Sequence, residues 1–317
     1  MLAATLVILC GTLSAPGEPP ALHSGEIGAE GFRCVVGDNE QWDDQHGAGY
    51  NGVFLMDMPG MTSIPFVPQY AGLNLEHYFD LGPRSEDNSI FFEPRRAPMA
   101  FTRLDDHTVE LHQPTSPHYG VESWSRFEVN TPGRVDLRFR CVPRKPDLEG
   151  GMLGVFWASY INAPMDKSVY FLAAGATLDK PVWVQYCTQG HNRDSTVCAE
   201  NDLREFAFQG KKDTLYSNIS PLRYGVPFFY GNHGDHVLIY IFEPNALIRF
   251  SHSPSGGGPT PAKDGYNPAW DFQYLIPGYE TGKEYGFRMR LVCKAWKDRA
   301  DVLAEVRACL KEMGGDR

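Results

Sequence analysis

The sequence has little that marks the common nucleotide-binding and hydrolase folds. It has no P-loop, no G-x-S-x-G elbow and no internal repeat, and its GxGxxG string at 47–52 lies in a polar, turn-rich segment. Nucleotide binding and α/β-hydrolase chemistry therefore have little motif support. A CxxC pair is also missing, so a structural zinc site has no ligand pattern, and neither a metal nor a cofactor is expected.

Positive charge is scarce. The chain has 39 acidic and 29 basic residues and a net charge of −10. A nucleic-acid partner is not expected, because phosphate contacts need a basic surface. The balance favours neutral or cationic partners, although a local arginine cluster could still hold an acid.

Long apolar runs are absent apart from the first fifteen residues, MLAATLVILCGTLSA. This run is too short to span a bilayer, and it ends in small residues like the cleavage site of a secretory signal. We therefore expect a signal peptide at 1–15, a flexible segment at 16–31, and a secreted or periplasmic protein without a membrane segment after cleavage.

Six cysteines follow the predicted signal. An even number in an exported chain permits disulfides, and Cys187 and Cys198 flank a short segment that makes them the most plausible pair. Alternatively, most of the cysteines are buried thiols, because Cys141 and Cys293 lie within strand patterns.

Short strands dominate the rest of the chain. Aromatic residues make up 13%, and 24 prolines and 32 glycines are typical of strands joined by turns. The clearest alternation is VDLRFRCV, residues 135–142, with Val135 and Leu137 inward. Residues 89–92 are also predicted to begin a strand.

The fold class predicted is all-β: a large antiparallel two-sheet sandwich, supersandwich-like, formed by one domain at 32–317. A split near 143–151 into two smaller sandwiches would give the same patterns. The last twenty residues contain one apolar helical stripe, so we expect a C-terminal α-helix at 298–313 that packs on the edge of the sandwich.

The segment 248–290 concentrates the residues that a site needs. It contains Ser251-His252-Ser253, three consecutive glycines at 256–258, and Asn267-Pro268-Ala269-Trp270-Asp271. Loops on a rigid β scaffold often carry function, and glycines allow a backbone to approach a ligand closely. A surface loop between two strands would explain the same letters.

Other polar and aromatic groups supply further candidates. Glu122, Trp124 and Arg126 fall on one face of a strand, where an indole amid charges suits a sugar ring. Arg95 and Arg96 form a candidate carboxylate-binding pair. Glu–Arg ladders on exposed sheets and ion pairs at strand ends are the structural alternatives.

Four phrases carry a resemblance to known proteins: YAGLNLEH at 70–77, FWASY at 156–160, SPSGGG at 253–258 and NPAWD at 267–271. They resemble exported β-rich proteins of unassigned function from bacteria that degrade polysaccharides. More loosely, the layout is similar to galactose mutarotase-like proteins. That resemblance implies a β-supersandwich and sugar chemistry, and it transfers no individual catalytic residue.

We therefore expect a carbohydrate ligand or substrate, and an enzyme (a lyase, hydrolase or isomerase) acting on a polysaccharide or oligosaccharide. A non-catalytic glycan-binding module or a protein-interaction domain is the alternative. The candidate catalytic residues are His118, His191, Arg223, Tyr224, His252 and Asp271. The candidate substrate-binding residues are Glu76, His77, Arg96, Glu122, Trp124, Arg126, Tyr230 and Trp270. We predict that His252 and Asp271 lie near His191, Arg223 or His118 in one cleft.

Overall fold

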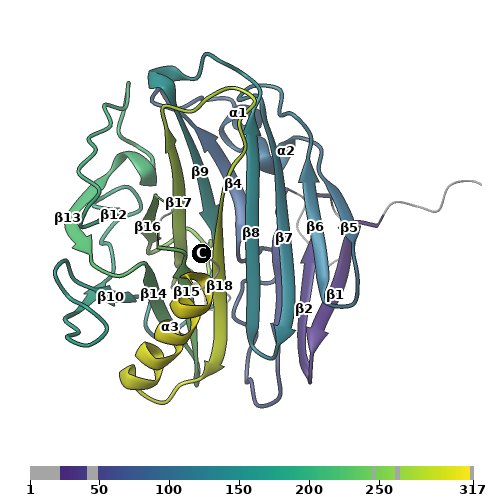
Figure 1. The fold of residues 1–317 in the computed structure, drawn as a ribbon, viewed down its shortest axis with the longest axis vertical. Coiled ribbons are helices and arrows are strands. Elements are labelled where there is room, and N and C mark those ends of the chain that lie inside the picture. Colours follow the sequence, from purple (N-terminus) through teal and green to yellow (C-terminus); the bar gives the residue numbers. More distant parts are fainter. Residues whose placement is uncertain (1–21, 41–48, 245–246, 261–264, 315–317) are drawn as a thin grey trace, which may run out of the picture.

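Alternating strands build two large, mainly antiparallel sheets that pack face to face (Figure 1). The computed structural model describes residues 22–40, 49–244, 247–260 and 265–314. The predicted all-β sandwich with a C-terminal helix is confirmed. The predicted signal peptide at 1–15 lies outside the described residues.

The larger sheet has nine strands. In spatial order they are β11 (Trp183–Tyr186), β10 (Val169–Leu172), β14 (Phe228–His233), β15 (His236–Phe242), β18 (Tyr285–Ala295), β8 (Arg134–Pro143), β7 (Val121–Thr131), β6 (Thr108–Gln113) and β5 (Ala100–Arg103).

The smaller of the two facing sheets has six strands. In spatial order they are β13 (Ile219–Tyr224), β12 (Thr196–Ala199), β16 (Ile248–Ser253), β17 (Ala269–Pro277), β9 (Met152–Ala158) and β4 (Asn74–Phe79). Only β12 and β13 pair in parallel among the described strands. Both large sheets contain strands from before and after residues 143–151.

A three-stranded sheet of β1 (Ser24–Ala29), β2 (Phe32–Gly37) and β3 (Gly52–Asp57) lies against β6 and β7 (Figure 1). The sequence placed residues 24–29 in a flexible segment. They form a strand instead, because Ile27 is buried in the core and the backbone pairs with β2 through its full length.

The main core lies between the two large sheets. Val135, Leu137 and Phe139 of β8 point into it, as the alternation predicted. From the opposite sheet, Trp157 and Phe272 stack with ring centroids 6.0 Å apart. Packing of these inner faces fixes the six-stranded sheet, and with it the outer face on which the pocket is built.

The C-terminal helix α3 (Arg299–Gly314) confirms the predicted helix, but its position differs from the prediction. It covers the outer face of β15 and β18 rather than an edge of the sandwich (Figure 1). β15 is buried on both faces, so Val237 and Ile239 need an apolar cover, which Val302 and Val306 provide.

Residues 89–91 are helical and Phe92 is a turn residue, which corrects the predicted strand. The first three belong to α1 (Asn88–Phe91), and Phe92 links it to α2 (Glu93–Arg96). The Asp87 carboxylate accepts the Ser89 N–H at 2.8 Å and begins the first turn, and Pro94 suits the start of the second. These local caps override the strand propensity of the aromatic residues.

The six described cysteines are free thiols. The predicted Cys187–Cys198 disulfide is therefore wrong: Cys198 is buried within β12, and Cys187 is exposed beyond the end of β11. Among the described residues, no helix is long and apolar enough to cross a membrane.

Candidate functional site

The outer face of the six-stranded sheet carries a group of polar side chains. Along β17, Phe272 and Tyr274 belong to the main core, while Asp271 and Gln273 point to the other side. Both faces of β17 are nevertheless buried, because loops and short helices cover the outer one. Polar groups are thus held in a partly desolvated space.

A β-bulge in β4 adds two more polar residues to this face. The register between β4 and β9 shifts between Leu75 and His77, so Glu76 is an extra residue opposite β9. Strict alternation would send Glu76 and His77 to opposite faces. The bulge lets both line the outer side, as bulges beside functional sites often do.

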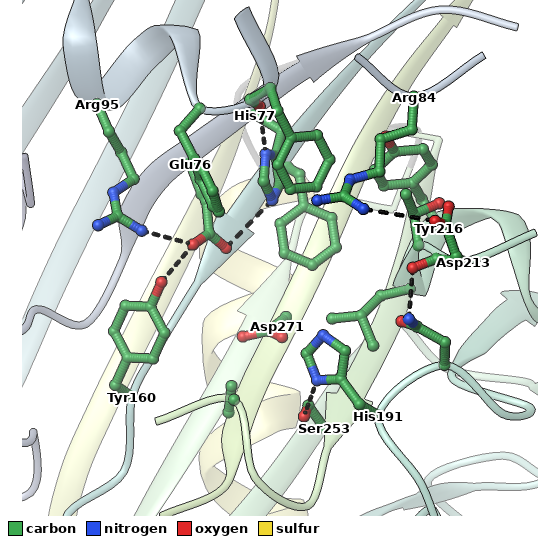
Figure 2. Close-up of a pocket in the computed structure, with 18 of the residues that line it drawn as sticks. Glu76, His77, Arg84, Arg95, Tyr160, His191, Asp213, Tyr216, Ser253 and Asp271 are labelled. Atoms are coloured by element: carbon green, nitrogen blue, oxygen red, sulfur yellow. Dashed lines mark hydrogen bonds and ion pairs between the residues drawn. The ribbon is translucent and has the colours of Figure 1, made fainter. Parts of the chain in front are cut away.

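These strands form the floor of a pocket of about 380 Å³ (Figure 2). Its walls come from the segments around 50, 70, 84–95, 191–192, 213–216 and 253–258. The lining residues are Tyr50, Tyr70, Glu76, His77, Arg84, Phe91, Phe92, Arg95, Phe156, Tyr160, His191, Asn192, Asp213, Thr214, Leu215, Tyr216, Ser253, Gly256, Gly258, Ala269 and Asp271.

Glu76 is the centre of a polar cluster at one end of the pocket. Its Oε1 accepts a hydrogen bond from Arg95 Nη1 at 3.0 Å and another from the Tyr160 hydroxyl (Figure 2). Its Oε2 lies 3.5 Å from His77 Nε2. Burial raises the pKa of Tyr160, which keeps the phenol protonated as a donor.

Arg95, the partner of Glu76, is held in place by two aromatic rings and a backbone carbonyl. Its guanidinium lies 3.9 Å from the centre of the Tyr50 ring and 4.8 Å from that of Phe92. Its Nε donates to the Gly49 carbonyl at 2.5 Å. Stacking on two aromatic rings fixes the plane of the guanidinium, so the direction of its remaining donors is preset.

His77 is a buried, neutral imidazole. Its Nδ1 lies 2.6 Å from the Phe91 carbonyl, which places the proton on that nitrogen. Burial lowers the pKa of His77, and the nearby Glu76 carboxylate opposes this shift. The aromatic rings of Phe91, Phe92 and Phe156 surround it.

Asp271 supplies a second carboxyl group, which, unlike that of Glu76, has no arginine partner among the described residues of the pocket. It is 1% exposed, and its Oδ1 accepts the Ser159 backbone N–H at 3.1 Å. Burial and the Glu76 charge raise the pKa of Asp271 well above its ordinary value. The pocket therefore contains a carboxylic acid that stays protonated where an exposed aspartate would be ionised.

His191 faces Asp271 from the loop that follows β11. Its Nδ1 lies 2.7 Å from the Ser253 hydroxyl, and the other ring nitrogen points into the pocket (Figure 2). Partial burial lowers the pKa of His191, with Glu76 opposing the shift. The imidazole is thus unprotonated near neutral pH and able to accept a proton.

Aromatic rings form much of the wall. Tyr50 and Tyr70 stack with centroids 4.5 Å apart, and Tyr160 contacts both edge to face. Tyr216 stacks on Phe79 at 4.0 Å on the other side. Such surfaces pack well against the C–H faces of a ring-shaped ligand.

The glycine-rich loop at 256–258 closes one side of the pocket. Gly258 has a φ of +76°, which disfavours other residues, and a Cβ there would lie 3.4 Å from the Tyr70 hydroxyl. Gly257 N–H donates to the Asn267 carbonyl and Asn267 N–H to the Gly258 carbonyl, at 3.0 and 2.8 Å. The loop is therefore anchored against the segment that leads into β17.

Four of the predicted site residues meet in the pocket. Glu76 and His77 come from β4, Asp271 from β17 and His191 from a loop, and all four line the cavity. The predicted proximity of Asp271 and His191 is found within this one pocket (Figure 2).

His252 does not join them. It is fully buried on the inner side of β16, where Nδ1 accepts the Thr188 N–H at 3.2 Å and Nε2 lies 2.9 Å from the Lys167 carbonyl. Trp270 also points inward and donates its indole N–H to Lys167. The alternation of β16 and β17 explains both positions.

Arg223, Tyr224, His118 and Tyr230 lie elsewhere as well. Arg223 contacts backbone carbonyls within its own edge strand β13, and the Tyr224 hydroxyl donates to the Ile248 carbonyl in the core. The His118 backbone N–H donates to Glu93 at 2.5 Å. Tyr230 accepts from Arg299 at 3.1 Å beside the start of α3.

Glu122, Trp124 and Arg126 occupy the outer face of the nine-stranded sheet, on the same side of β7 as the alternation predicted. Trp124 is not an open platform, since His112 stacks on it at 5.0 Å and Arg140 lies 4.9 Å from its ring. Arg96 is exposed and does not line the pocket, whereas its neighbour Arg95 does.

The sequence missed Tyr160, Tyr70, Arg84 and Tyr216 as pocket residues. Tyr160 and Tyr70 fall within FWASY and YAGLNLEH, two of the phrases that resemble known proteins, so this resemblance could have identified them. Arg84 and Tyr216 lie in weakly patterned segments, and nothing local marks them.

Among the described residues, no group of three His, Cys, Asp or Glu side chains is arranged to hold a metal ion.

Comparison with known proteins assigns no family. No protein-family model and no curated protein matches the chain. Among solved structures, a galactose mutarotase-related enzyme from Lactobacillus acidophilus is similar at a TM-score of 0.48 and 8% identity, over 87% of this chain and 98% of that one. An aldose epimerase homologue from C. elegans is similar at 0.44 and 10%, over 86% and 100%. A 4-alpha-glucanotransferase from Thermococcus litoralis reaches 0.45 and 10%, over 85% of this chain and 37% of that one.

Proposed function

We propose that this protein is a carbohydrate-active enzyme that moves protons to and from a sugar bound in the pocket. The observation that carries this proposal is that one cavity is lined by both a buried carboxyl group whose pKa is raised (Asp271) and an imidazole whose pKa is lowered (His191). Groups whose environments shift their pKa values in this way are the usual acid and base of such reactions.

The remaining lining suits a sugar. The Glu76 carboxylate and the Arg95 guanidinium accept and donate hydrogen bonds, which matches the mixed character of sugar hydroxyls. The Tyr50–Tyr70 stack makes this wall of the pocket aromatic, with Arg95 and Tyr70 already packed on the Tyr50 ring. Because Glu76 is already fixed by Arg95 and Tyr160, it serves binding and orientation better than proton transfer.

Reactions at the anomeric carbon need one group that protonates an oxygen and another that removes a proton. Asp271 is placed to donate, and His191 to accept through the ring nitrogen that faces the pocket. We therefore favour an isomerase or hydrolase over a lyase. A lyase also needs a cation for the uronate, and both of the described arginines that line the pocket already pair with carboxylates, Arg95 with Glu76 and Arg84 with Asp213.

A substrate panel tests the proposal. Anomer interconversion of reducing sugars, release of sugars from oligosaccharides, and formation of unsaturated products from uronates are measured separately, by NMR and by product analysis. We expect turnover in one of the first two assays. Turnover only in the third replaces the isomerase or hydrolase with a lyase.

Two variants then test the roles. Asp271→Asn and His191→Gln are each expected to lower kcat by about 10²–10⁴-fold at unchanged fold. His112→Gln, on the outer face of the nine-stranded sheet, is the matched control and should keep full activity. Sugar binding without turnover in the wild type would instead support the glycan-binding alternative, and no binding to any sugar would refute the carbohydrate proposal.

Export is proposed on the sequence alone. The apolar segment at 1–15 supports cleavage near residue 15 and a secreted or periplasmic protein. N-terminal sequencing of the protein recovered from its natural source tests this directly, because an intact Met1 would contradict cleavage.

A further inference from the structure

Three arginines lie side by side on the outer face of the nine-stranded sheet. Arg126 of β7 is directly opposite Arg138 of β8, and Arg138 is directly opposite Arg288 of β18. Their neighbours Phe127 and Leu137 point into the core, so the three side chains share the outer face. Like charges at directly opposed positions destabilise a sheet unless something neutralises them.

The two outer arginines are neutralised within the protein. Arg126 Nη2 lies 3.0 Å from Glu110 Oε2. Arg288 Nε lies 3.3 Å from Glu243 Oε2, and its Nη2 donates to the Met313 carbonyl at 2.7 Å. Arg138, in the middle, is exposed and has no hydrogen-bond or ion-pair partner among the residues that the structure describes.

A cavity of about 250 Å³ lies over this row. The strands form its floor, and the last turn of α3 forms one wall. Its lining residues are Arg126, Glu128, Asp136, Leu137, Arg138, Arg288, Met289, Arg290, Glu312 and Met313. The central guanidinium thus faces a concave space rather than a flat surface.

Most of the carboxylates near this cavity are already engaged. Asp136 takes two hydrogen bonds from Arg290, at 2.6 and 2.9 Å, and Glu312 takes a third at 2.5 Å. Glu128 accepts a hydrogen bond from Asn130. It is the cross-strand partner of Asp136, so both carboxylates lie on the same side of the three arginines. An anion is therefore excluded from that side and directed toward Arg138.

We propose that this cavity binds an oxyanion, a carboxylate or a sulfate group, through the free fork of Arg138 with Arg126 and Arg288 on either side. A guanidinium matches the two oxygens of such a group in a bidentate arrangement. The site lies on the sheet opposite the sugar pocket, so it does not depend on the proposed enzymatic function.

A first experiment compares the stability of the free protein at low salt. Arg138→Gln removes the central charge, and it should leave the melting temperature unchanged or raise it, because it relieves repulsion from two neighbouring cations. A drop in melting temperature would show that Arg138 has a structural partner and would overturn the proposal. Arg307→Gln, an exposed arginine on α3 that pairs with Asp179, is the matched control.

A second experiment measures binding. Sodium sulfate and an oligogalacturonate are titrated separately, with sodium chloride at matched ionic strength as the blank, and the thermal shift and calorimetric heat are recorded. We expect saturable binding of at least one of the two by the wild type and by Arg307→Gln, and affinity at least about tenfold weaker for Arg138→Gln. Sulfate alone would identify a small-anion site, and the oligomer alone a site for an acidic glycan. Equal responses from all three proteins, or none, would overturn the proposal.

Discussion

A carboxyl group buried as completely as that of Asp271 is more stable protonated than ionised. The unfolded chain ionises this group near pH 4, whereas the folded protein keeps the proton to a higher pH. The folded state therefore binds one more proton over that interval, and its stability falls as pH rises. The acid that the proposed reaction needs thus costs folding stability at neutral pH.

Asp271→Asn should remove this pH dependence. Between about pH 4 and the folded pKa, the stability of the wild type should fall relative to the variant by up to about 1.4 kcal/mol per pH unit. The amide oxygen still accepts the Ser159 N–H, so the fold is expected to persist. Urea unfolding from pH 4 to pH 8 measures the difference, and parallel profiles for the two proteins would contradict a protonated Asp271.

His252 has the reverse dependence. Burial lowers its pKa to about 4, so the folded protein stays neutral at this residue while the unfolded chain takes up a proton below about pH 6.5. The wild type should lose on the order of 3 kcal/mol of stability between pH 6.5 and pH 4 from this residue.

His252→Gln should flatten that acid limb and cost about 1–3 kcal/mol at pH 7, because the Thr188 and Lys167 groups lose their partner. Chemical denaturation at both pH values measures the two effects. If the folded variant also lost turnover while binding substrate normally, His252 would have a catalytic part that its position in the core does not explain.

Individual pocket residues were predictable where the residue type itself carries chemistry. Glu76 and His77 lie in the phrase YAGLNLEH and Asp271 lies in NPAWD, two of the phrases that carry the resemblance to known proteins. The structure brings all three residues into one pocket. The choice between Arg95 and Arg96 was not predictable, because it depends on the turn of α2 rather than on residue type. His252 was misplaced because strand parity, not chemistry, decides which face of β16 it occupies.

At the scale of elements, helix α3 covers part of the outer face of the nine-stranded sheet and shields it from solvent. Val302, Val306 and Cys309 cover Val237 and Ile239 of β15, which is why that strand reads as an unbroken apolar run. An unbroken run predicts burial on both faces, but it does not say which element supplies the second cover. The helix was therefore predictable, and its docking position was not.

Val306→Asp should destabilise the protein by about 3 kcal/mol or more, because it places an unpaired charge between the helix and the sheet. Ala304→Asp, exposed on the same helix, should change stability by no more than about 0.5 kcal/mol. Thermal and urea unfolding provide the measurement. Equal effects of the two changes would mean that α3 does not rest on β15.

The β4 bulge shows where pattern reasoning stops. The letters LEHYF alternate too poorly to fix a register, and strict alternation would have sent either Glu76 or His77 away from the pocket. The extra residue is apparent only from pairing with β9, a strand more than seventy positions later in the chain. Long-range pairing decided this detail, and no local signal encodes it.

For the molecule as a whole, the all-β sandwich was predictable because many strands carry their own period-two alternation, and the order of strands within the sheets was not. Neighbours in space such as β18 and β8 are far apart in sequence. Many topologies satisfy the same alternation, so fold class emerges from the sequence before topology does.

The molecule also lacks covalent cross-links among its described cysteines. Burial raises the pKa of Cys293 to about 12 and that of Cys309 to about 11, so these thiols should be inert in the folded state. A thiol reagent should label Cys187 in the native protein and the buried cysteines only after unfolding. Mass spectrometry of labelled peptides tests this, with Cys187→Ser as the control; native protein that resists labelling until it is reduced would indicate a disulfide.

The strands that form the floor of the pocket are synthesised at widely separated times. Its strands β4, β9 and β17 come from residues 74–79, 152–158 and 269–277, and β9 lies between the other two. A chain emerging from the ribosome therefore presents Glu76 and His77 early, while Asp271 arrives only after most of the protein has been made. Strand pairing over such distances is slow and follows synthesis. The pocket is thus among the last parts of the molecule to assemble, and a nascent chain carries the side chains proposed to bind a sugar well before it carries the proposed acid.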